Sequence, residues 1–403
     1  EGEAVTVKAE GRPMDRRRGN LSSVWFTRVL CHLEIRCARC MGWTLRRFPL
    51  TKAVPLAISR GTTSAVERLE LSLEQDGITG RGETGGLDTG HRAYDLESIE
   101  AELQALLPAL QPLDPHDRAA VAPLLSSLSP PARCAVDLAL WDWWGQFLQQ
   151  PLWRLFCLDG RCGVATSVTL GLASVEGVQQ RLNRWWDQLP ATRIKLKLGS
   201  PDGLDHDRRL LQAVASMLRI RTQETGVEHE LQVDANGGWT VQEAMVMQSA
   251  LVAADVVLLE QPIAAKVDPQ EDLDGFAALR AHCSLPLVAD ESCWGLEDLL
   301  RLAPHVDAVN LKLLKTGGLT EALLMARVAG RLGLDLMVGC YSDSALLNGA
   351  ASQLLSLIRW PDLDSHLNLV DDPYVGLPLQ QDRLTPPSGP GLGIHRAVLS
   401  DQA

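Results

Sequence analysis

The sequence feature that most constrains the fold is a set of three acidic residues that each close a run of apolar, mostly leucine and β-branched residues. They are Asp234 in LQVDAN, Glu260 in VVLLEQP and Asp290 in LPLVADES. Such a run is typical of a buried parallel strand whose carboxyl end enters a polar site. The spacings of 26 and 30 residues leave room for one helix and two loops between successive strands. The pattern therefore predicts the βα repeat of a barrel.

These three carboxylates also predict a metal site. A single acidic residue at a strand end is usually an ordinary loop or cap residue. The prediction rests on the threefold recurrence of an apolar run that ends in a carboxylate. Three carboxylates at the same end of neighbouring strands repel one another unless a cation lies between them. An all-oxygen ligand set suits a hard divalent ion. We therefore expect Asp234, Glu260 and Asp290 to bind Mg²⁺, with Mn²⁺ as the alternative.

The βα alternation continues along the chain. The strand candidates are Thr166–Leu170, Arg193–Leu198, Leu231–Asp234, Val256–Glu260, Leu285–Asp290, Ala308–Leu313, Leu336–Gly339 and a short one around Leu363. Amphipathic helical stretches separate most of them, and a Pro/Gly-rich tail follows. Eight strands that alternate with helices predict an α/β protein with a TIM-like barrel as one domain.

Residues ahead of this repeat have a different pattern. Residues 43–83 are strand-like, with a predicted turn at Asp76–Gly77 and a polar link over 59–64, containing Arg60, that is predicted as a surface loop. Two helices are predicted after them, Glu97–Leu107 and Pro131–Leu148. Strands followed by helices predict an α+β cap in front of the barrel.

The first forty residues differ from the rest of the chain. Their formal net charge is +3, which leaves about −15 on the remainder, because the whole chain carries −12. Cys31, Cys37 and Cys40 lie near His32, but this spacing matches no zinc module. We predict that residues 1–40 are an N-terminal extension that is disordered or not native.

Composition narrows the choice of partner and location. A formal net charge of −12 disfavours nucleic acid and anionic membranes as partners, so a small-molecule ligand is expected. The nine cysteines lack paired spacing through most of the chain, which indicates reduced thiols. No apolar run reaches the roughly 18 residues of a membrane span. Together these features predict a cytoplasmic protein.

Three lysines lie inside strand candidates, where lysine is uncommon. In RIKLKL, the strand period of two places Lys195 and Lys197 on one face, directed into the barrel mouth, although a solvated edge strand is the alternative. Lys312 lies 115 residues after Lys197, four strands further round and therefore on the opposite wall. A lysine beside a second ammonium and a divalent cation has a lowered pKa and can act as a base. Two opposed lysines indicate proton removal from one face of a carbon and return from either face.

Together these motifs resemble the enolase superfamily, in its muconate-lactonizing subgroup, over roughly residues 43 to 395. The resemblance rests on the lysines and acids above, with Asn236 and Gln261 beside the acids, and on further motifs: NLKLLKTGG at 310–318, AVDLALWD at 135–142, GxGE at 80–83 and PGLG at 390–393. It implies that Lys197 and Lys312 are the acid/base residues, that Lys195 is an electrostatic helper and that the three acids bind Mg²⁺.

The resemblance also implies a domain organisation. An α+β capping domain over 41–160 would lie on a modified (β/α)₇β barrel over 161–370. A C-terminal segment over 371–403 would return to the capping domain and complete it.

Specificity residues are expected near the last strands. Asp362 and Asp364 form a DxD that resembles the dipeptide epimerases, in which it holds the free N-terminus of the substrate; a polar turn after Pro361 is the alternative. The resemblance also implies a role for Arg60, which lies where some dipeptide epimerases have a capping-loop arginine that meets an acidic side chain of the substrate. Thr169 is expected to line the pocket. Tyr341 and Asp343 stand where relatives commonly have Gly-x-Met and a glutamate, so the wall of the pocket differs here.

Taken together, the sequence predicts an isomerase, a Mg²⁺-dependent dipeptide epimerase of the L-Ala-D/L-Glu type. It would invert the C-terminal residue through a metal-stabilised enediolate, with a dipeptide as partner and a homo-oligomer as one possible assembly. The alternatives on the same scaffold are o-succinylbenzoate synthase, N-succinylamino acid racemase and cycloisomerase. A catalytically idle metal-binding scaffold, or a binder acting through the basic N-terminal arm, is the alternative from another class.

Overall fold

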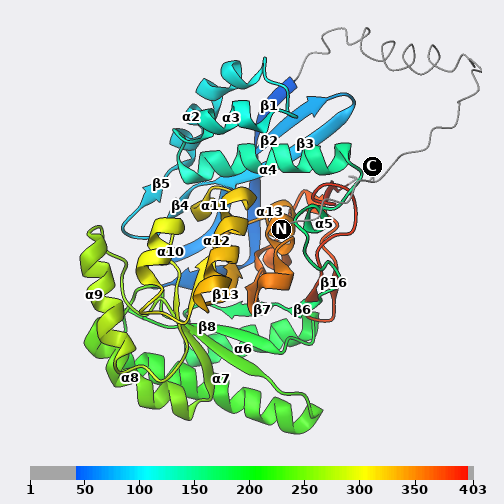
Figure 1. The fold of residues 1–403 in the computed structure, drawn as a ribbon. Coiled ribbons are helices and arrows are strands. Elements are labelled where there is room, and N and C mark those ends of the chain that lie inside the picture. The colour runs from blue at the N-terminus through cyan, green and yellow to red at the C-terminus, as the bar shows by residue number, and fades with distance from the viewer. Residues whose placement is uncertain (1–41, 398–403) are drawn as a thin grey trace, which may run out of the picture. The chain divides into compact units, whose positions relative to one another are not determined.

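A three-stranded meander opens the part of the chain that the structure, a computed structural model, describes, residues 42–397 (Figure 1). The extension predicted over 1–40 lies outside the described residues. β1 (Gly42–Ile58), β2 (Gly61–Gln75) and β3 (Ile78–Gly85) pair antiparallel in this order. Asp76 and Gly77 join the last two with φ angles of 54° and 75°, the left-handed values of a tight hairpin turn. This confirms the predicted Asp-Gly turn.

The link between β1 and β2 differs from the prediction. Only Ser59 and Arg60 lie between the two strands, and Thr62 and Thr63 pair with Ala57 and Leu56. The surface loop predicted over 59–64 is therefore a tight hairpin turn. Threonine, which is polar and β-branched, is common in strands as well as in loops. Here the backbone pairing of Thr62 and Thr63 with β1 makes this segment a strand.

Helices pack on this meander and form a core with it. They are α2 (Leu96–Leu110), α3 (Arg118–Leu125) and α4 (Pro130–Phe147). α4 begins where Ser129 accepts a hydrogen bond from the amide of Ala132 and Pro130 takes the first helical position, two favourable start signals. The helix runs so close to β3 that a Cβ at Gly82 would lie 2.0 Å from the carbonyl oxygen of Ala135, so only glycine fits there.

An eight-stranded parallel sheet follows, with its strands in sequence order. The strands are β7 (Ser167–Leu170), β8 (Arg193–Lys197), β9 (Glu230–Asp234), β10 (Val256–Glu260), β11 (Leu287–Ala289), β12 (Ala308–Leu311), β13 (Asp335–Gly339) and β14 (Trp360–Asp362). Between them lie α6 (Val175–Gln188), α7 (Leu204–Thr225), α8 (Val241–Ala253), α9 (Pro269–Arg280), α10 (Leu296–Leu302), α11 (Leu313–Thr316), α12 (Leu319–Leu332), α13 (Ala345–Ser352) and the 3₁₀ turn η1 (Leu355–Leu357).

Contacts between the first and last strands nearly close the sheet. The amide of Leu363 donates to Thr166 Oγ1 at 2.9 Å, and Ser167 Oγ donates to the carbonyl oxygen of Pro361 at 3.4 Å. Eight strands joined by seven helical crossovers confirm the predicted (β/α)₇β barrel. The predicted strand around Leu363 ends slightly earlier, at Asp362.

A layer of apolar side chains supports the polar strand ends. Leu258, Val288, Ala308, Met337 and Trp360 form one buried cluster. They lie two residues before Glu260, Asp290, Asn310, Gly339 and Asp362, which are at or next to the strand ends. Because side chains alternate along a strand with a period of two, these residues share a face with the strand-end positions. The apolar layer thus packs inside the barrel directly beneath the polar strand ends.

The remaining short elements tie the C-terminal segment to the earlier parts. They are β4 (Leu87–Asp88), β5 (Ala93–Tyr94), α5 (Leu152–Leu155), β6 (Val164–Ala165), η2 (Ser365–Asn368), β15 (Tyr374–Val375), β16 (Leu379–Gln380), β17 (Arg383–Leu384) and β18 (His395–Arg396). Arg396 forms an ion pair with Glu70 of β2 at 2.6 Å, and the amide of Leu392 donates to Asp142 of α4 at 2.8 Å. The domain boundaries stay a prediction. Among the helices of residues 42–397, none has the length and apolar character needed to cross a membrane.

Candidate metal and active site

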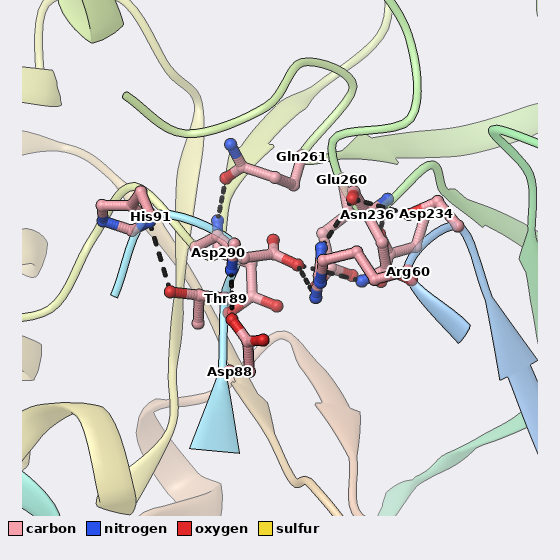
Figure 2. Close-up of polar contacts among 12 residues, drawn as sticks. Arg60, Asp88, Thr89, His91, Asp234, Asn236, Glu260, Gln261 and Asp290 are labelled. Carbon is pink, nitrogen blue, oxygen red and sulfur yellow. Dashed lines mark hydrogen bonds and ion pairs between the residues drawn. The ribbon is translucent and has the colours of Figure 1, made fainter. Parts of the chain in front are cut away.

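The three predicted acids meet at one end of the barrel. Asp234 and Glu260 are the last residues of β9 and β10, and Asp290 follows β11 directly. These strands are neighbours, and Asp234 pairs in register with Glu260. All three side chains are fully buried, and one carboxylate oxygen of each lies within 4.8 Å of the others (Figure 2). The common edge of the parallel strands is what brings them together.

This cluster has the chemistry of a divalent-cation site. Burial, and then the charge of Asp234, raise the pKa of Glu260 to about 8, because carboxylates that share a buried space resist ionisation together. A hard cation bound among their oxygens would remove that cost, and an all-oxygen donor set suits Mg²⁺. The residues present therefore fit a magnesium ion.

Lysines surround the acids. Lys195 Nζ lies 2.7 Å from oxygens of both Glu260 and Asp362 and 3.1 Å from Asp234 Oδ2, and Lys197 Nζ lies 2.6 Å from the same oxygen of Asp234. Lys312 Nζ lies 2.7 Å from Asp290 Oδ2. Both β8 lysines are buried. The solvated edge strand, which was the alternative from the sequence, is therefore not what the structure has.

The pKa values of Lys195 and Lys312 run opposite to the sequence expectation. Burial alone lowers the pKa of Lys195, but the charges of Asp362, Glu260 and Asp234 outweigh it and hold that pKa well above its usual value. Asp290 does the same for the pKa of Lys312. The expected lowering assumed a divalent cation beside each lysine. Where the carboxylates face the lysines directly, their attraction dominates.

One hollow brings the two proposed base residues together. Lys197 and Lys312, on β8 and just after β12, both line a hollow of about 350 Å³ between the barrel mouth and the meander. Their strands, β8 and β12, are four positions apart in the sheet. Lys312 Nζ lies 4.5 Å from the centroid of the Tyr341 ring, which lines the same hollow.

Polar neighbours orient the acids. The amide of Asp290 donates to Gln261 Oε1 at 2.9 Å, and Asn236 Nδ2 donates to Asp234 Oδ2 at 3.3 Å (Figure 2). Lys315 Nζ lies 2.6 Å from Asp290 Oδ1 and also donates to its carbonyl oxygen, and Asn310 Nδ2 donates to Glu260 Oε1 at 2.8 Å. Lys315 and Asn310 were not among the predicted site residues. Both lie inside the NLKLLKTGG motif, which was the signal that could have identified them.

The two acids of the DxD motif lie in the gap between β14 and β7. Asp362 contacts Lys195 and accepts a hydrogen bond from Ser167 Oγ at 2.6 Å. Asp364 Oδ2 accepts a hydrogen bond from the amide of Thr169 at 2.7 Å. Burial and the neighbouring charge of Asp362 raise the pKa of Asp364 to about 6. Asp364 and Thr169 line a second hollow, so they are open to a ligand, whereas Asp362 is held by protein groups.

Two of the remaining predicted residues are held by other parts of the chain. The Arg60 guanidinium donates to the carbonyl oxygen of Asn236 at 2.7 Å (Figure 2). It also donates to Glu291 Oε1 at 2.8 Å. It would have to leave Glu291 to meet a substrate carboxylate. Asp343 forms an ion pair with Arg68 of β2 and accepts from the amide of Tyr341. It lines neither hollow, so the structure places Asp343 in the support of the wall and Tyr341 in the wall itself.

This architecture of capping meander, (β/α)₇β barrel and buried acidic triad defines an enolase-like protein. Residues 177–397 match the family described as "Enolase C-terminal domain-like", and residues 43–157 match "Mandelate racemase / muconate lactonizing enzyme, N-terminal domain". The chain belongs to the enolase superfamily, in the group of mandelate racemase and muconate lactonizing enzyme.

Several relatives have described activities. A protein of Flavobacteria bacterium MS024-2A named hydrophobic dipeptide epimerase is 35% identical over 88% of this chain and 98% of its own. The substrate-liganded L-Ala-D/L-Glu epimerase of Bacillus subtilis superposes with a TM-score of 0.80 at 25% identity, over 89% of this chain and 99% of the other. The dipeptide epimerase of Enterococcus faecalis in complex with Mg and L-Leu-L-Tyr gives 0.77 at 27% identity, over 88% and 99%.

Proposed function

We propose that this protein is a Mg²⁺-dependent dipeptide epimerase whose reaction is of the L-Ala-D/L-Glu type, the inversion of the C-terminal residue of a dipeptide. The observation that carries the proposal is the pair Lys197 and Lys312, which come from strands four positions apart and line one hollow beside a buried acidic triad. The names of the relatives support it, since they include hydrophobic dipeptide and L-Ala-D/L-Glu epimerases. A metal-binding scaffold without catalysis has no use for two opposed lysines.

In the proposed reaction, Asp234, Glu260 and Asp290 hold the cation. When bound, it supplies positive charge that stabilises the enediolate formed as the α-proton leaves. Lys197 faces one side of the α-carbon and Lys312 the other. One lysine takes the proton at its Nζ, and the other returns a proton to the opposite face, so the configuration inverts. Lys195, buried among three carboxylates, keeps its positive charge and adds to the electrostatic stabilisation.

A neutral lysine is required for the first step. The carboxylates that now hold the lysine protons also contain the oxygens that would bind the cation. If these carboxylates held a divalent cation, less of the negative charge of Asp290 would act on Lys312, and the pKa of Lys312 would be lower than without the cation. This restores the direction that the sequence predicts for a metal-loaded site.

The free N-terminus of the dipeptide is proposed to bind at the DxD motif. Asp364 is the acid that lines a hollow, and Asp362 adds negative charge behind it. The alternatives on this scaffold, o-succinylbenzoate synthase, N-succinylamino acid racemase and cycloisomerase, act on substrates without an ammonium group. The ammonium thus separates the proposed function from its alternatives. The cytoplasmic location and a homo-oligomeric assembly stay predictions.

The test of the proposed function is a dipeptide library assayed for deuterium uptake from D₂O, with N-acetylated counterparts of each substrate. Acetylation removes a charge-assisted contact that typically contributes about 1.5–3 kcal/mol. We expect kcat/KM to fall by roughly ten- to 150-fold. Asp364→Asn should cause a similar fall, and the two changes should be less than additive because they remove the same contact. N-acylated amino acids that turn over as well as free dipeptides would point to the acylamino-acid racemase instead.

A further inference from the structure

A second hollow continues from the catalytic one. Leu56 and Tyr341 line both hollows, so the two adjoin at these side chains. The second hollow, of about 120 Å³, is lined by Asp364 on the barrel side, by Lys52 on β1 and by Arg181 on α6. A dipeptide whose ammonium group binds at Asp364 has its N-terminal side chain one carbon further on. The second hollow is the adjoining space for that side chain.

Lys52 is unusual among the lysines of this chain. Residues 42–397 contain six lysines, and five of them are buried. Four of these, Lys195, Lys197, Lys312 and Lys315, lie within 3.1 Å of a carboxylate oxygen. Lys52 is 7% exposed, and its ammonium group has no hydrogen-bond or ion-pair partner in the described part of the chain. Burial lowers the pKa of Lys52 although the charges of Cys340, Asp364 and Asp343 oppose this effect. An anion bound in the hollow beside Lys52 would therefore stabilise its charged form.

Arg181 adds a second cation to the same hollow. Its guanidinium lies 4.1 Å from the centroid of the Trp185 ring, and Nη2 donates to Asn368 Oδ1 at 3.0 Å. Nη1 is buried without a partner among residues 42–397. Stacking on the ring fixes the plane of the guanidinium and leaves one donor unused.

The charges of the hollow favour an anion. Asp362 is already paired with Lys195, so Asp364 is the one lining carboxylate that faces Lys52 and Arg181. A substrate ammonium bound at Asp364 would raise the positive excess further. A carboxylate on the same substrate residue would offset this excess and supply the partner that both cations lack.

We propose that the dipeptide substrate carries an acidic N-terminal residue, aspartyl or glutamyl, whose side-chain carboxylate binds Lys52 and Arg181 in this hollow. The proposal rests on the proposed epimerase function and specifies its substrate class. It departs from the relatives named for hydrophobic dipeptides.

The experiment compares four compounds that share a C-terminal residue, with Leu and Glu each used in turn. They are the L-Asp, L-Asn and L-Ala dipeptides and the N-succinyl amino acid, assayed by α-deuterium exchange with saturating Mg²⁺. L-Asp and L-Asn differ in the side-chain charge alone, whereas the L-Asp dipeptide and the N-succinyl compound differ in the ammonium alone. We expect kcat/KM for L-Asp to exceed that for L-Asn by about tenfold or more, the usual range for a charge-assisted contact.

Variants assign the preference to its residues. Lys52→Met and Arg181→Gln should each reduce the ratio of the L-Asp to the L-Asn rate to about one, whereas Lys52→Arg should keep it above one. The matched control is Lys266→Met, because Lys266 is exposed and lines neither hollow. Thermal unfolding serves as the fold check, and Lys52→Met should raise Tm because it removes a buried charge without a partner.

The outcomes separate this proposal from the epimerase function. If L-Asn or L-Ala dipeptides exchange as fast as L-Asp in the unchanged protein, or if Lys52→Met leaves the ratio intact, the acidic preference is wrong while the epimerase function stands. If no dipeptide exchanges and the N-succinyl compounds do, the epimerase function itself fails. In that case Lys52 and Arg181 hold the succinyl carboxylate.

Discussion

Lys197→Ala and Lys312→Ala are each expected to abolish epimerisation, with a loss of roughly 10²–10⁴-fold or more, the usual contribution of a positioned proton-transfer group. The reason is geometric. The two lysines lie four strands apart round the barrel and line the same hollow. In the proposed mechanism each serves one face of the α-carbon and does not replace the other. The variant should still exchange the α-proton of the one stereoisomer that the surviving lysine faces. Proton NMR in D₂O with each pure stereoisomer measures both quantities.

The loss of activity in the two lysine variants is informative only if the variants remain folded. Lys197 is buried against Asp234, and removing one partner of a buried ion pair costs about 3–5 kcal/mol when the other charge stays unpaired. Lys195 still contacts Asp234 at 3.1 Å, and saturating Mg²⁺ should offset the rest. Circular dichroism under the assay conditions checks the fold, and Lys266→Met is the matched control. If both single variants invert substrate at near wild-type rates, the two-base mechanism is refuted.

Most of the barrel and the centre of the site follow from local patterns. Apolar runs that end in Asp234, Glu260 and Asp290 give the strand ends, and the strand period of two brings Lys195 and Lys197 to one face. The carboxyl ends of parallel strands share one edge of the sheet, so the acids and the lysines come together there. A reader of the sequence can therefore place the acids and the lysines together without knowing any single distance.

The contacts that set the walls of the site depend on distant parts of the chain. Asp343 pairs with Arg68, which lies 275 residues earlier, and Arg60 pairs with Glu291, 231 residues later. A charged side chain near a strand end has several candidate partners, and only the packing of the meander on the barrel selects one. The burial of Lys52 is likewise not predictable from the sequence. It lies in a long strand with alternating exposure, where the sequence does not distinguish a solvated lysine from a buried one.

Asp234→Asn, Glu260→Gln and Asp290→Asn are each expected to lower activity by at least about a hundredfold, because a Lewis-acidic cation contributes several kcal/mol to such a step and about 1.4 kcal/mol corresponds to tenfold. The barrel should remain folded. In the metal-free protein these carboxylates repel one another, and burial with the charge of Asp234 already raises the pKa of Glu260 to about 8. At Glu260 a neutral amide therefore relieves repulsion. At Asp234 and Asp290 an amide removes the charge partner of Lys197 or Lys312, so circular dichroism checks that these two variants keep the fold.

Binding of the cation has its own readout, independent of turnover. A ligand that binds the folded state alone stabilises it by about 2.7 kcal/mol at a concentration of 100 times its Kd, so Mg²⁺ should raise the Tm of the unchanged protein. The three variants should lose most of this shift, whereas Glu228→Gln should keep it, because this exposed glutamate precedes the start of β9 and Asp234 lies at the other end of that strand. In the proposed reaction the cation stabilises the negative charge of the enediolate. An excess of chelator should therefore abolish activity. Full turnover in excess chelator would refute a role for the metal in the reaction. The three acids would then serve only as ion-pair partners of the lysines.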